Sequence, residues 1–350
     1  MKNIDEIFFK LLGHNKISSR YIIRDFHLIR DKKNIRWIIE DNDQLSILLN
    51  DWRPFNKYSN LKWKIIILMH KFKLLRYIPK SSFKRIKIAL DFLNNEKSLE
   101  EISICIYLGR KTYENHKAII FIFNTKEKKC FNILKMAINE SSWNSIKKEY
   151  KVLKSFNDDL RLYIPKVFSL NKSEKYFVQE YIDGKNYQIK IDNNHYNFLS
   201  SLVNKNEIID LKALKNNLIN YYKKLITLVN KEFFLIDEIE YALSLKIWDK
   251  EVQSVKVHGD FAPWNIKYSK FYNRIFVYDW EEYKSSYLPF YDLIYYKLSI
   301  KNFLNLKIEF DKYKYINFLG KNGYFIKKVY VEDVYFISKI FALTHFKLHK

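Results

Sequence analysis

The sequence predicts an α+β protein in which a small antiparallel sheet with one helix precedes a larger, mostly helical region. Two observations support this prediction. Short runs of β-branched and aromatic residues cluster between residues 102 and 182, and a single helical pattern interrupts them. Beyond residue 190, apolar residues recur mainly at helical spacing, with only two short strand patterns. Strands followed by helices are typical of a two-lobed α+β fold.

Residues 1–98 precede this pattern, and we expect them to form a mostly helical, basic N-terminal extension. Helical periodicity extends from Asn60 to Asn94, and DWRPF at Asp51–Phe55 breaks the segment. Residues 51–90 contain eleven basic residues and one acidic residue, a net charge of +10, interleaved with apolar residues. Such a segment can form a solvated helix face, lie on an anionic membrane or bind a phosphate-rich partner.

Residues 99–183 are predicted to form the small sheet, in the order β-β-β-α-β-β. A helix is expected from Ser141 to about Phe156, with Ser142 as its cap, because Ile146, Tyr150 and Leu153 share one face. Thr125–Lys129 suits a hairpin turn. The five strands are expected at Ile102–Arg110, Lys117–Asn124, Cys130–Ala137, Lys166–Asn171 and Lys175–Ile182.

Residues 184–350 are predicted to form the mostly helical region. Helical spacing covers Asn194 to about Trp248 and resumes at Asp292. Between them lies a hairpin with strands at Ile266–Tyr268 and Ile275–Tyr278.

The composition limits the class of protein. Hydrophobic residues make up 48% of the 350 residues, which is enough for a packed core and excludes wholesale disorder. No apolar run approaches the roughly 20 residues of a membrane-spanning helix, and the N-terminus lacks the pattern of a signal peptide. Two cysteines, Cys105 and Cys130, indicate no disulfide framework. We therefore expect a cytoplasmic protein.

The net charge of +23 has two interpretations. A basic surface attracts nucleic acid, anionic lipid or phosphorylated ligands. Alternatively, the excess of lysine accompanies many Asn, Ile, Tyr and Phe residues, a bias typical of AT-rich coding.

The stretch from Val257 to Tyr283 contains the groups that phosphoryl transfer needs. That reaction requires a carboxylate near the attacking hydroxyl and oxygen ligands for Mg²⁺. Asp260 can orient the acceptor hydroxyl and take its proton, and the side-chain oxygen of Asn265 can bind the metal. The hairpin returns Asp279 beside Asn265, where its carboxylate can share the same ion. His258 is interpreted as a hydrogen-bonding support of the loop.

The motif H-G-D-F-A-P-W-N (residues 258–265), followed by D-W-E (residues 279–281), resembles the aminoglycoside phosphotransferase/choline kinase family, a branch of the protein-kinase-like fold. The resemblance covers about residues 100–345. It implies a bilobal kinase-like fold with residues 258–265 as catalytic loop and 279–281 as metal motif. Two residues depart from the family pattern, Ala262 and Trp264, and both are expected to influence the choice of acceptor.

The resemblance also implies a nucleotide site upstream. A kinase-like site pairs a strand lysine, which holds the phosphates of ATP, with a glutamate on the next helix. Lys135 and Glu149 occupy these places, and strand alternation would put Lys135 on the face of Phe131 and Ile133. Main-chain groups of Glu180, Tyr181 and Ile182 would bind adenine, and Asp292 would brace the catalytic loop. The phosphate loop is expected between residues 109 and 117, with no single residue assigned.

Two functions are compatible with this sequence. The first is an ATP- and Mg²⁺-dependent kinase acting on a hydroxyl of a sugar, amino alcohol or glycoconjugate precursor. The amino-acid sequence of residues 258–265 resembles that of family members associated with bacterial surface-polysaccharide synthesis. The second is a kinase-fold binding module docked through residues 51–90 to an anionic membrane or nucleic acid. Nucleic acid is disfavoured, since no nucleic-acid-binding motif is present.

Overall fold

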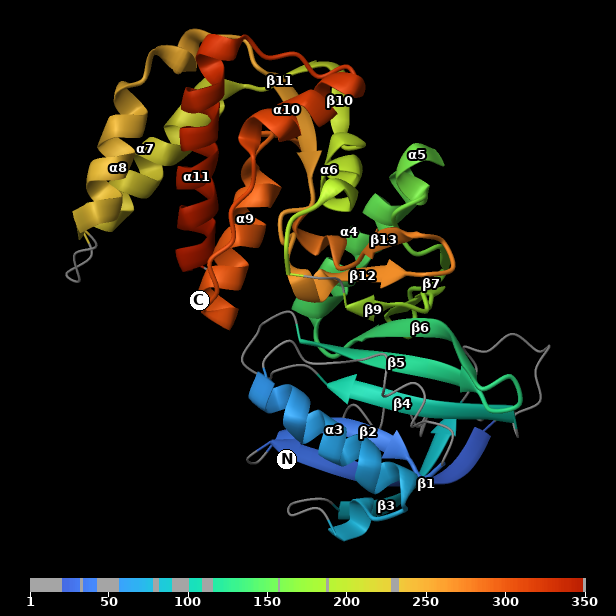
Figure 1. Cartoon of the computed structure of the whole chain (residues 1–350). Coiled ribbons are helices and arrows are strands. Elements are labelled where there is room, and N and C mark those ends of the chain that lie inside the picture. Colours follow the sequence, from blue (N-terminus) through green and yellow to red (C-terminus); the bar gives the residue numbers. More distant parts are fainter. Residues whose placement is uncertain are drawn as a thin grey trace. The chain divides into compact units, whose positions relative to one another are not determined.

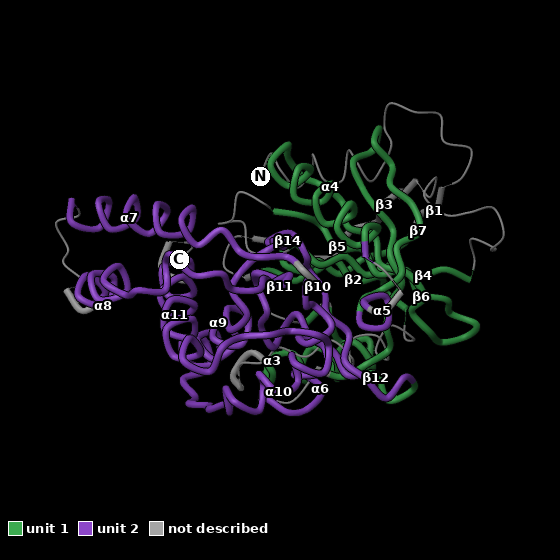
Figure 2. Tube along the Cα trace, turned by 90° about the horizontal axis from the view of Figure 1, so that it is seen from above, with its two compact units in different colours: residues 1–155, 164–186, 269–271 green, residues 156–163, 187–268, 272–350 purple. Residues whose placement is uncertain are grey.

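The computed structural model describes residues 21–31, 34–42, 57–77, 82–89, 101–108, 116–156, 158–186, 189–227 and 233–348. The chain folds into two units, which Figure 2 shows in green and purple. Unit 1 consists of residues 1–155, 164–186 and 269–271. Unit 2 consists of residues 156–163, 187–268 and 272–350.

Unit 1 is built on an eight-stranded antiparallel sheet, counted over the described residues (Figure 1). Its strands follow the order β3-β1-β2-β4-β5-β6-β8-β7. They are β1 (Tyr21–Asp31), β2 (Asn34–Glu40), β3 (Ser82–Ala89), β4 (Ile102–Leu108), β5 (Lys117–Asn124), β6 (Lys129–Ala137), β7 (Val167–Asn171) and β8 (Tyr176–Glu180). A two-residue strand, β9 (Lys185–Asn186), follows.

The order predicted for residues 99–183 is confirmed. β4, β5 and β6 pair as neighbours, helix α4 (Glu140–Ser155) follows, and β7 and β8 complete the series. Ser142 was expected to cap α4, but Asn139 takes that place, because its side chain accepts the backbone N–H of Ser142 at 2.8 Å. The Ser142 hydroxyl in turn accepts the backbone N–H groups of Ile138 and Asn139, each at 3.0 Å. The two side chains together satisfy amides at the helix start.

The prediction of a mostly helical N-terminal extension was wrong for residues 21–31, 34–40 and 82–89. There the chain forms β1, β2 and β3. Of the residues before 99 that the structure describes, only α3 (Lys57–Lys71) and the short helix η1 (Leu75–Tyr77) are helical. β2 pairs with β4, with Trp37 opposite Tyr107, so these strands extend the sheet within unit 1, on both sides of the boundary expected at residue 98. Short apolar runs fit strands as well as helices, and pairing with a sheet edge decided between them. The DWRPF stretch lies outside the described residues.

The two faces of this sheet bury separate apolar clusters. One cluster includes Ile38, Ile106, Ile120 and Leu134. The other, here called the α3 face, contains Trp37, Phe121, Ile133 and Tyr181 together with Trp63 of α3 and Leu75. Alternation along each strand separates the two sets, and α3 covers part of the second.

Unit 2 is mostly helical, as expected for residues 184–350. Its longer helices are α6 (Asn193–Ser200), α7 (Leu211–Thr227), α8 (Phe233–Ser244), α9 (Tyr291–Ser299), α10 (Lys312–Lys321) and α11 (Val331–Leu348). α7 packs beside α8, and α9 packs beside α11 (Figure 1). A small antiparallel sheet joins β10 (Val203–Ile208), β11 (Gln253–Val257) and β14 (Lys284–Tyr287).

The predicted hairpin is confirmed as β12 (Ile266–Ser269) and β13 (Arg274–Val277). β11 ends directly before His258, so this strand and the hairpin frame the polar loop between them. Within the described ranges, none of the helices combines the length and the apolar character needed to cross a bilayer.

Candidate active site

The loop after β11 is held by hydrogen bonds from His258. Its Nε2 lies 2.7 Å from the carbonyl oxygen of Tyr278, and its Nδ1 accepts the backbone N–H of Asp260 at 3.2 Å. The ring therefore carries its proton on Nε2 and links the loop to the end of β13. The side chain is fully buried, and both nitrogens are engaged. This geometry suits a loop support, the role expected of His258.

Gly259 allows the loop to turn. Its φ angle is +89°, in the region that L-residues rarely adopt. A Cβ atom at this position would lie 2.2 Å from the carbonyl oxygen of Glu282. The close approach of two backbone segments therefore requires glycine here.

Asn265 holds Asp260 at two points. Its Nδ2 donates to the backbone carbonyl oxygen of Asp260 and to carboxylate oxygen Oδ2, both at 2.9 Å. These bonds use the amide nitrogen and direct the amide oxygen, a hard ligand, away from them. Asn265 is buried, and it sits in the short 3₁₀ turn η4 (Pro263–Asn265).

The hairpin brings Asp279 to the same place. The backbone N–H of Tyr278 donates to the carbonyl oxygen of Asn265 at 2.9 Å, which joins the chain before β12 to the chain after β13. Asp279 follows with φ +68°, a left-handed conformation that non-glycine residues adopt only under local constraint. The negative charge of Asp279 raises the pKa of Asp260, consistent with their proximity.

The pKa of Asp260 is raised to about 7, first by burial and then by the charge of Asp279. Hydrogen bonds from Tyr295 and Asn265 oppose this shift because they stabilise the carboxylate. Tyr295 lies on α9, and burial together with Asp260 raises the pKa of its phenol. The hydroxyl of Tyr295 therefore stays protonated and donates to Asp260.

Asp292, near the start of α9, accepts two backbone hydrogen bonds from the loop. Oδ2 accepts the N–H of His258 at 2.7 Å, and Oδ1 accepts the N–H of Gly259 at 3.0 Å. Burial raises the pKa of Asp292 to about 7 against these two bonds and the nearby charge of Lys284. The contacts are those of a brace for the loop.

In unit 1, Lys135 and Glu149 form a buried ion pair. Lys135 Nζ lies 2.5 Å from Glu149 Oε1, and both side chains are at most 5% exposed. A second lysine, Lys117 on β5, has its Nζ 3.9 Å from Glu149 Oε2. Lys135 shares the α3 face with Ile133, as expected, but Phe131 does not. The register shift opposite Ile122 and Phe123 leaves Phe131 without a pair, and its ring packs on the other face.

The segment predicted to bind adenine, residues 180–182, begins at the last residue of β8. Tyr181 donates its backbone N–H to the carbonyl oxygen of Phe131 at 3.2 Å, so this amide is not available to a nucleotide. Its ring is buried edge-on to Phe121, with centroids 6.5 Å apart. The backbone N–H of Glu180 is also used, since it donates to the carbonyl oxygen of Lys166 at 2.7 Å. The carbonyl group of Glu180 and the backbone of Ile182 remain the candidates. Residues 109–115 of the phosphate loop expected at residues 109–117 lie outside the described residues.

The donor set in unit 2 fits a hard divalent cation. Among the described residues, no group of three or more His, Cys, Asp and Glu side chains could hold a metal ion. The donors expected at the hairpin are instead the amide oxygen of Asn265 and the carboxylate of Asp279, next to the carboxylate of Asp260. Oxygen ligands of this kind suit Mg²⁺.

Two residues at these sites were not predicted. Tyr295 lies one turn after Asp292, and i,i+3 spacing on a helix already indicated that both side chains face the same loop. Lys117 lies opposite Ala137 and alternates with Ile119, the partner of Lys135, so strand alternation could have placed it on the α3 face.

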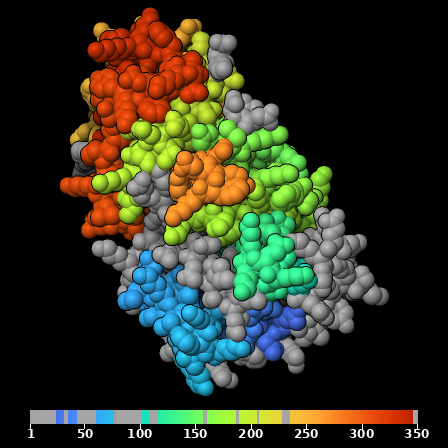
Figure 3. All heavy atoms as spheres, turned by 45° about the vertical axis from the view of Figure 1, so that its right-hand side comes forward, coloured from blue at the N-terminus to red at the C-terminus, as the bar shows by residue number. Residues whose placement is uncertain are grey.

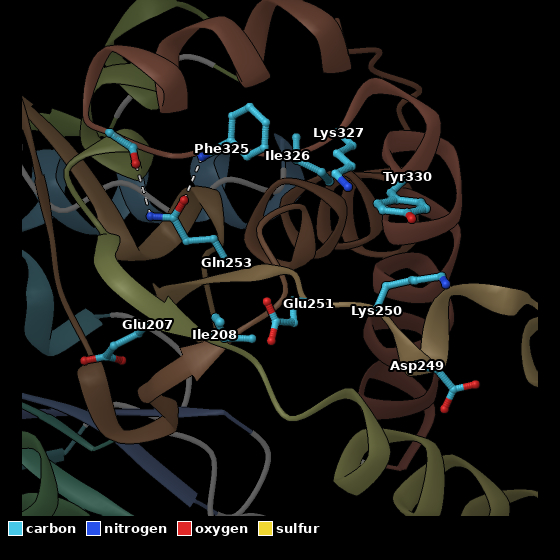
Figure 4. A pocket seen from close by; sticks show the side chains of 11 residues that line it. Glu207, Ile208, Asp249, Lys250, Glu251, Gln253, Phe325, Ile326, Lys327 and Tyr330 are labelled. Atoms are coloured by element: carbon cyan, nitrogen blue, oxygen red, sulfur yellow. Dashed lines mark hydrogen bonds between the residues drawn. The ribbon is translucent and has the colours of Figure 1, made fainter.

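Unit 2 also contains a shallow cavity of about 550 Å³ at the start of β11, the opposite end of that strand from the loop at residues 258–265 (Figure 4). Gln253 fixes its rim. Its Nε2 donates to the carbonyl oxygens of Asn204 and Gly323, and its Oε1 accepts the N–H of Phe325. The charged lining consists of Glu207, Asp249, Glu251, Lys250 and Lys327.

No protein-family model matches the sequence, and no curated protein matches it. Solved structures do resemble the fold. A macrolide 2'-phosphotransferase, MphH from Brachybacterium faecium, has a TM-score of 0.51 and 11% identity, covering 66% of this chain and 81% of that one. Macrolide 2'-phosphotransferase type I has a TM-score of 0.50 and 11% identity, covering 69% of this chain and 86% of that one. A choline/ethanolamine kinase family protein from Mesorhizobium loti has a TM-score of 0.47 and 13% identity, covering 74% and 82%.

The fold class predicted from the sequence is confirmed. The protein has a protein-kinase-like fold, with an antiparallel sheet and one inserted helix followed by a mostly helical part.

Proposed function

We propose that the protein is an ATP-dependent kinase that transfers the γ-phosphate to a hydroxyl group of a small molecule. The supporting observation is the arrangement in unit 2, where Asn265 holds Asp260 through two hydrogen bonds and the hairpin returns Asp279 beside Asn265. Phosphoryl transfer needs a positioned carboxylate and hard oxygen ligands, and both occur on this loop.

In this proposal Asp260 is the catalytic residue. Its carboxylate accepts a hydrogen bond from the acceptor hydroxyl and takes the proton as the hydroxyl oxygen attacks the γ-phosphorus. The bond between that phosphorus and the β,γ-bridging oxygen breaks, and ADP leaves. Asn265 and Tyr295 orient the carboxylate, and His258 and Asp292 hold the backbone that carries it.

Asn265 and Asp279 would hold Mg²⁺. The ion, when bound, supplies positive charge next to the phosphates. Both ligands are fixed by the backbone of the hairpin and of η4, so the site needs little rearrangement on binding.

For the nucleotide we propose Lys135, oriented by Glu149, as the contact of the ATP phosphates. The backbone of Glu180 and Ile182 would read the adenine ring. Tyr181 would line the adenine site with its buried ring, because its backbone N–H is already used in a hydrogen bond.

The acceptor we propose is a sugar, an amino alcohol or a glycoconjugate precursor, as in surface-polysaccharide synthesis. Of the two residues expected to influence acceptor choice, Ala262 is fully buried and therefore affects the acceptor site at most through packing. Trp264 is 38% exposed and packs edge-on against Phe303, with centroids 5.0 Å apart. Trp264 is the stronger candidate for stacking on a sugar ring.

A cytoplasmic location accompanies this proposal, since ATP is the phosphate donor. The alternative is a catalytically weak binding module on the same scaffold. The presence of Lys135, Glu149, Asp260, Asn265 and Asp279 favours catalysis.

The test measures ATP turnover with Mg²⁺ across sugars, nucleotide sugars, amino alcohols and lipid-linked glycans. Asp260→Asn should abolish turnover and leave the thermal shift by Mg-ATP in place. Asp237→Asn, at an exposed position on α8, serves as the matched control. Absence of both turnover and a Mg-ATP thermal shift in the intact protein would refute the kinase assignment, and full activity of Asp260→Asn would refute the assigned base.

A further inference from the structure

The outward side of α3 carries an exposed apolar stripe. Leu61, Ile65, Leu68 and Phe72 are 59%, 50%, 56% and 61% exposed. Their spacing of i, i+4, i+7 and i+11 puts them on one side of the helix. Phe72 follows the last residue of α3, but its N–H donates to the carbonyl oxygen of Leu68 at 3.1 Å and so continues the turn. Figure 3 shows this segment, in light blue, at the surface.

The opposite side of α3 is already used for packing. Trp63 is 3% exposed and contacts Trp37 of β2, with ring centroids 4.6 Å apart. His70, one more turn along, is 2% exposed, and its Nε2 lies 3.3 Å from the carbonyl oxygen of Glu40. These contacts fix the helix on the sheet. Core packing therefore accounts for the inner residues of α3 and leaves the outer stripe unexplained.

Lysines border the stripe on both sides. At about 100° per residue, Lys64 and Lys71 lie on one flank and Lys62 on the other, and all three are exposed. Residues 57–77 contain no aspartate or glutamate. An apolar stripe between cationic flanks, without acidic residues, is typical of a helix that lies in a membrane interface.

The end of α3 extends the same surface. Lys73 has φ +58°, and the N–H groups of Lys73 and Leu74 donate to the carbonyl oxygens of His70 and Met69 at 3.0 and 2.6 Å. This pair of bonds is a Schellman ending. It turns the chain so that Leu74 is 41% exposed and Tyr77 is 66% exposed after the stripe.

We propose that α3 docks the protein onto an anionic lipid surface, with the helix axis in the membrane plane. The stripe enters the boundary between headgroups and acyl chains, and the flanking lysines contact lipid phosphates. A nucleic acid would satisfy the lysines but leave the stripe in water. A second copy of this chain would bring two segments of the same positive charge together, which disfavours that occupant. This inference goes beyond phosphoryl transfer and does not depend on it.

The test uses the full chain and vesicle flotation, with vesicles of phosphatidylcholine alone or containing phosphatidylglycerol. The wild type should bind the anionic vesicles and bind neutral ones at least about tenfold more weakly, with binding reduced by salt. Ile65→Ser/Leu68→Ser and Lys64→Glu/Lys71→Glu should each reduce anionic binding about tenfold or more. Matched controls change exposed residues of unit 2, Phe325→Ser/Val329→Ser and Lys212→Glu/Lys223→Glu, and should bind as the wild type does.

A second measurement tests insertion without altering the charge or the stability of the core. A polarity-sensitive fluorophore on Leu68→Cys should shift to the blue with anionic vesicles, whereas the same label on Phe271→Cys should not. Both native cysteines, Cys105 and Cys130, are buried. Thermal melting of each variant shows that it is folded.

Three results would overturn the proposal. Equal binding to neutral and anionic vesicles would remove the role of the lysines. Binding to anionic vesicles that Ile65→Ser/Leu68→Ser leaves unchanged, together with no blue shift of the label on Leu68→Cys, would indicate a purely electrostatic contact. Duplex DNA would make the same contact. The third result would be a wild-type dimer, detected by light scattering, that does not bind lipid and that Ile65→Ser/Leu68→Ser dissociates. It would assign the stripe to contact with a second copy of the chain.

Discussion

The amide nitrogen of Asn265 donates to both the backbone carbonyl oxygen and the carboxylate of Asp260, at 2.9 Å each. One side chain thus fixes the position of a loop and the orientation of its acid. The same residue can offer its remaining oxygen to a metal ion. Substitutions that keep or remove each of these atoms separate the two roles.

Asn265→Asp keeps an oxygen for the metal but removes both donors and places a second carboxylate against Asp260. We expect kcat to fall about 10- to 100-fold, corresponding to about 1.4–2.7 kcal/mol in the barrier, with little change in the Mg²⁺ concentration required. Asn265→Ala removes the ligand as well and should also raise that Mg²⁺ requirement. Steady-state kinetics over a Mg²⁺ titration distinguish the two, with Asn302→Ala as an exposed control. An identical Mg²⁺ dependence of Asn265→Ala and the wild type would argue against the ligand assignment.

Gly259→Ala should destabilise unit 2 strongly. The φ angle of +89° and a Cβ position 2.2 Å from the carbonyl oxygen of Glu282 combine strain with a clash. We expect a loss of about 2–3 kcal/mol or more in the free energy of unfolding, measured by urea denaturation. Gly320→Ala is the matched control, because it lies in α10 with nothing near the added Cβ and should stabilise by about 0.5–1 kcal/mol. Equal stability of Gly259→Ala and the wild type would contradict the strain argument.

Replacing Glu149 should lower the free energy of unfolding more than replacing its ion-pair partner Lys135. Glu149→Leu leaves Lys135 buried near a second cation, Lys117, and should cost about 3 kcal/mol or more of unfolding free energy. Lys135→Met leaves Glu149 with Lys117 at 3.9 Å and should cost less.

Urea denaturation of the two variants gives this order. Lys126→Met is the control, because Lys126 is 78% exposed and its pair with Glu101 should contribute less than about 1 kcal/mol. The reverse order, with Lys135→Met the less stable variant, would show that Lys117 does not compensate Glu149.

Tyr295→Phe removes the hydroxyl that donates to Asp260 and leaves the ring on α9. We expect kcat to fall about tenfold, the effect of losing one hydrogen bond to a charged group of about 1.5 kcal/mol. The KM for ATP should not change, since a positioning role concerns Asp260 and not the nucleotide. Steady-state kinetics test this, with Tyr222→Phe on α7 as the control. An altered KM for ATP with unchanged kcat would refute the positioning role.

Local patterns in the sequence predicted much of the fold. The strands β4 to β8 and helix α4 follow from periods of two and 3.6 residues, and the hairpin follows from two short strands around a polar turn. The same patterns failed for β1, β2 and β3. Pairing with neighbouring strands, which lie far away along the chain, decided the structure there.

Part of the candidate site could be predicted from the sequence. Asp260, Asn265 and Asp279 belong to one short motif, and a hairpin of predictable length brings them together. Tyr295 and Lys117 were missed, since hydrogen bonds and ion pairs across elements depend on how helices and strands pack.

The sequence by itself determined the kinase-like order of elements, the chemistry of the loop at residues 258–265 and the basic character of residues 51–90. Only the tertiary structure decided that Gly259 must approach Glu282, that Ala262 is buried, and that α3 packs through Trp63 while its stripe faces outward. The physical reason is that spacing along the chain specifies which residues share a face. Which face is covered depends on packing between segments that are distant in sequence.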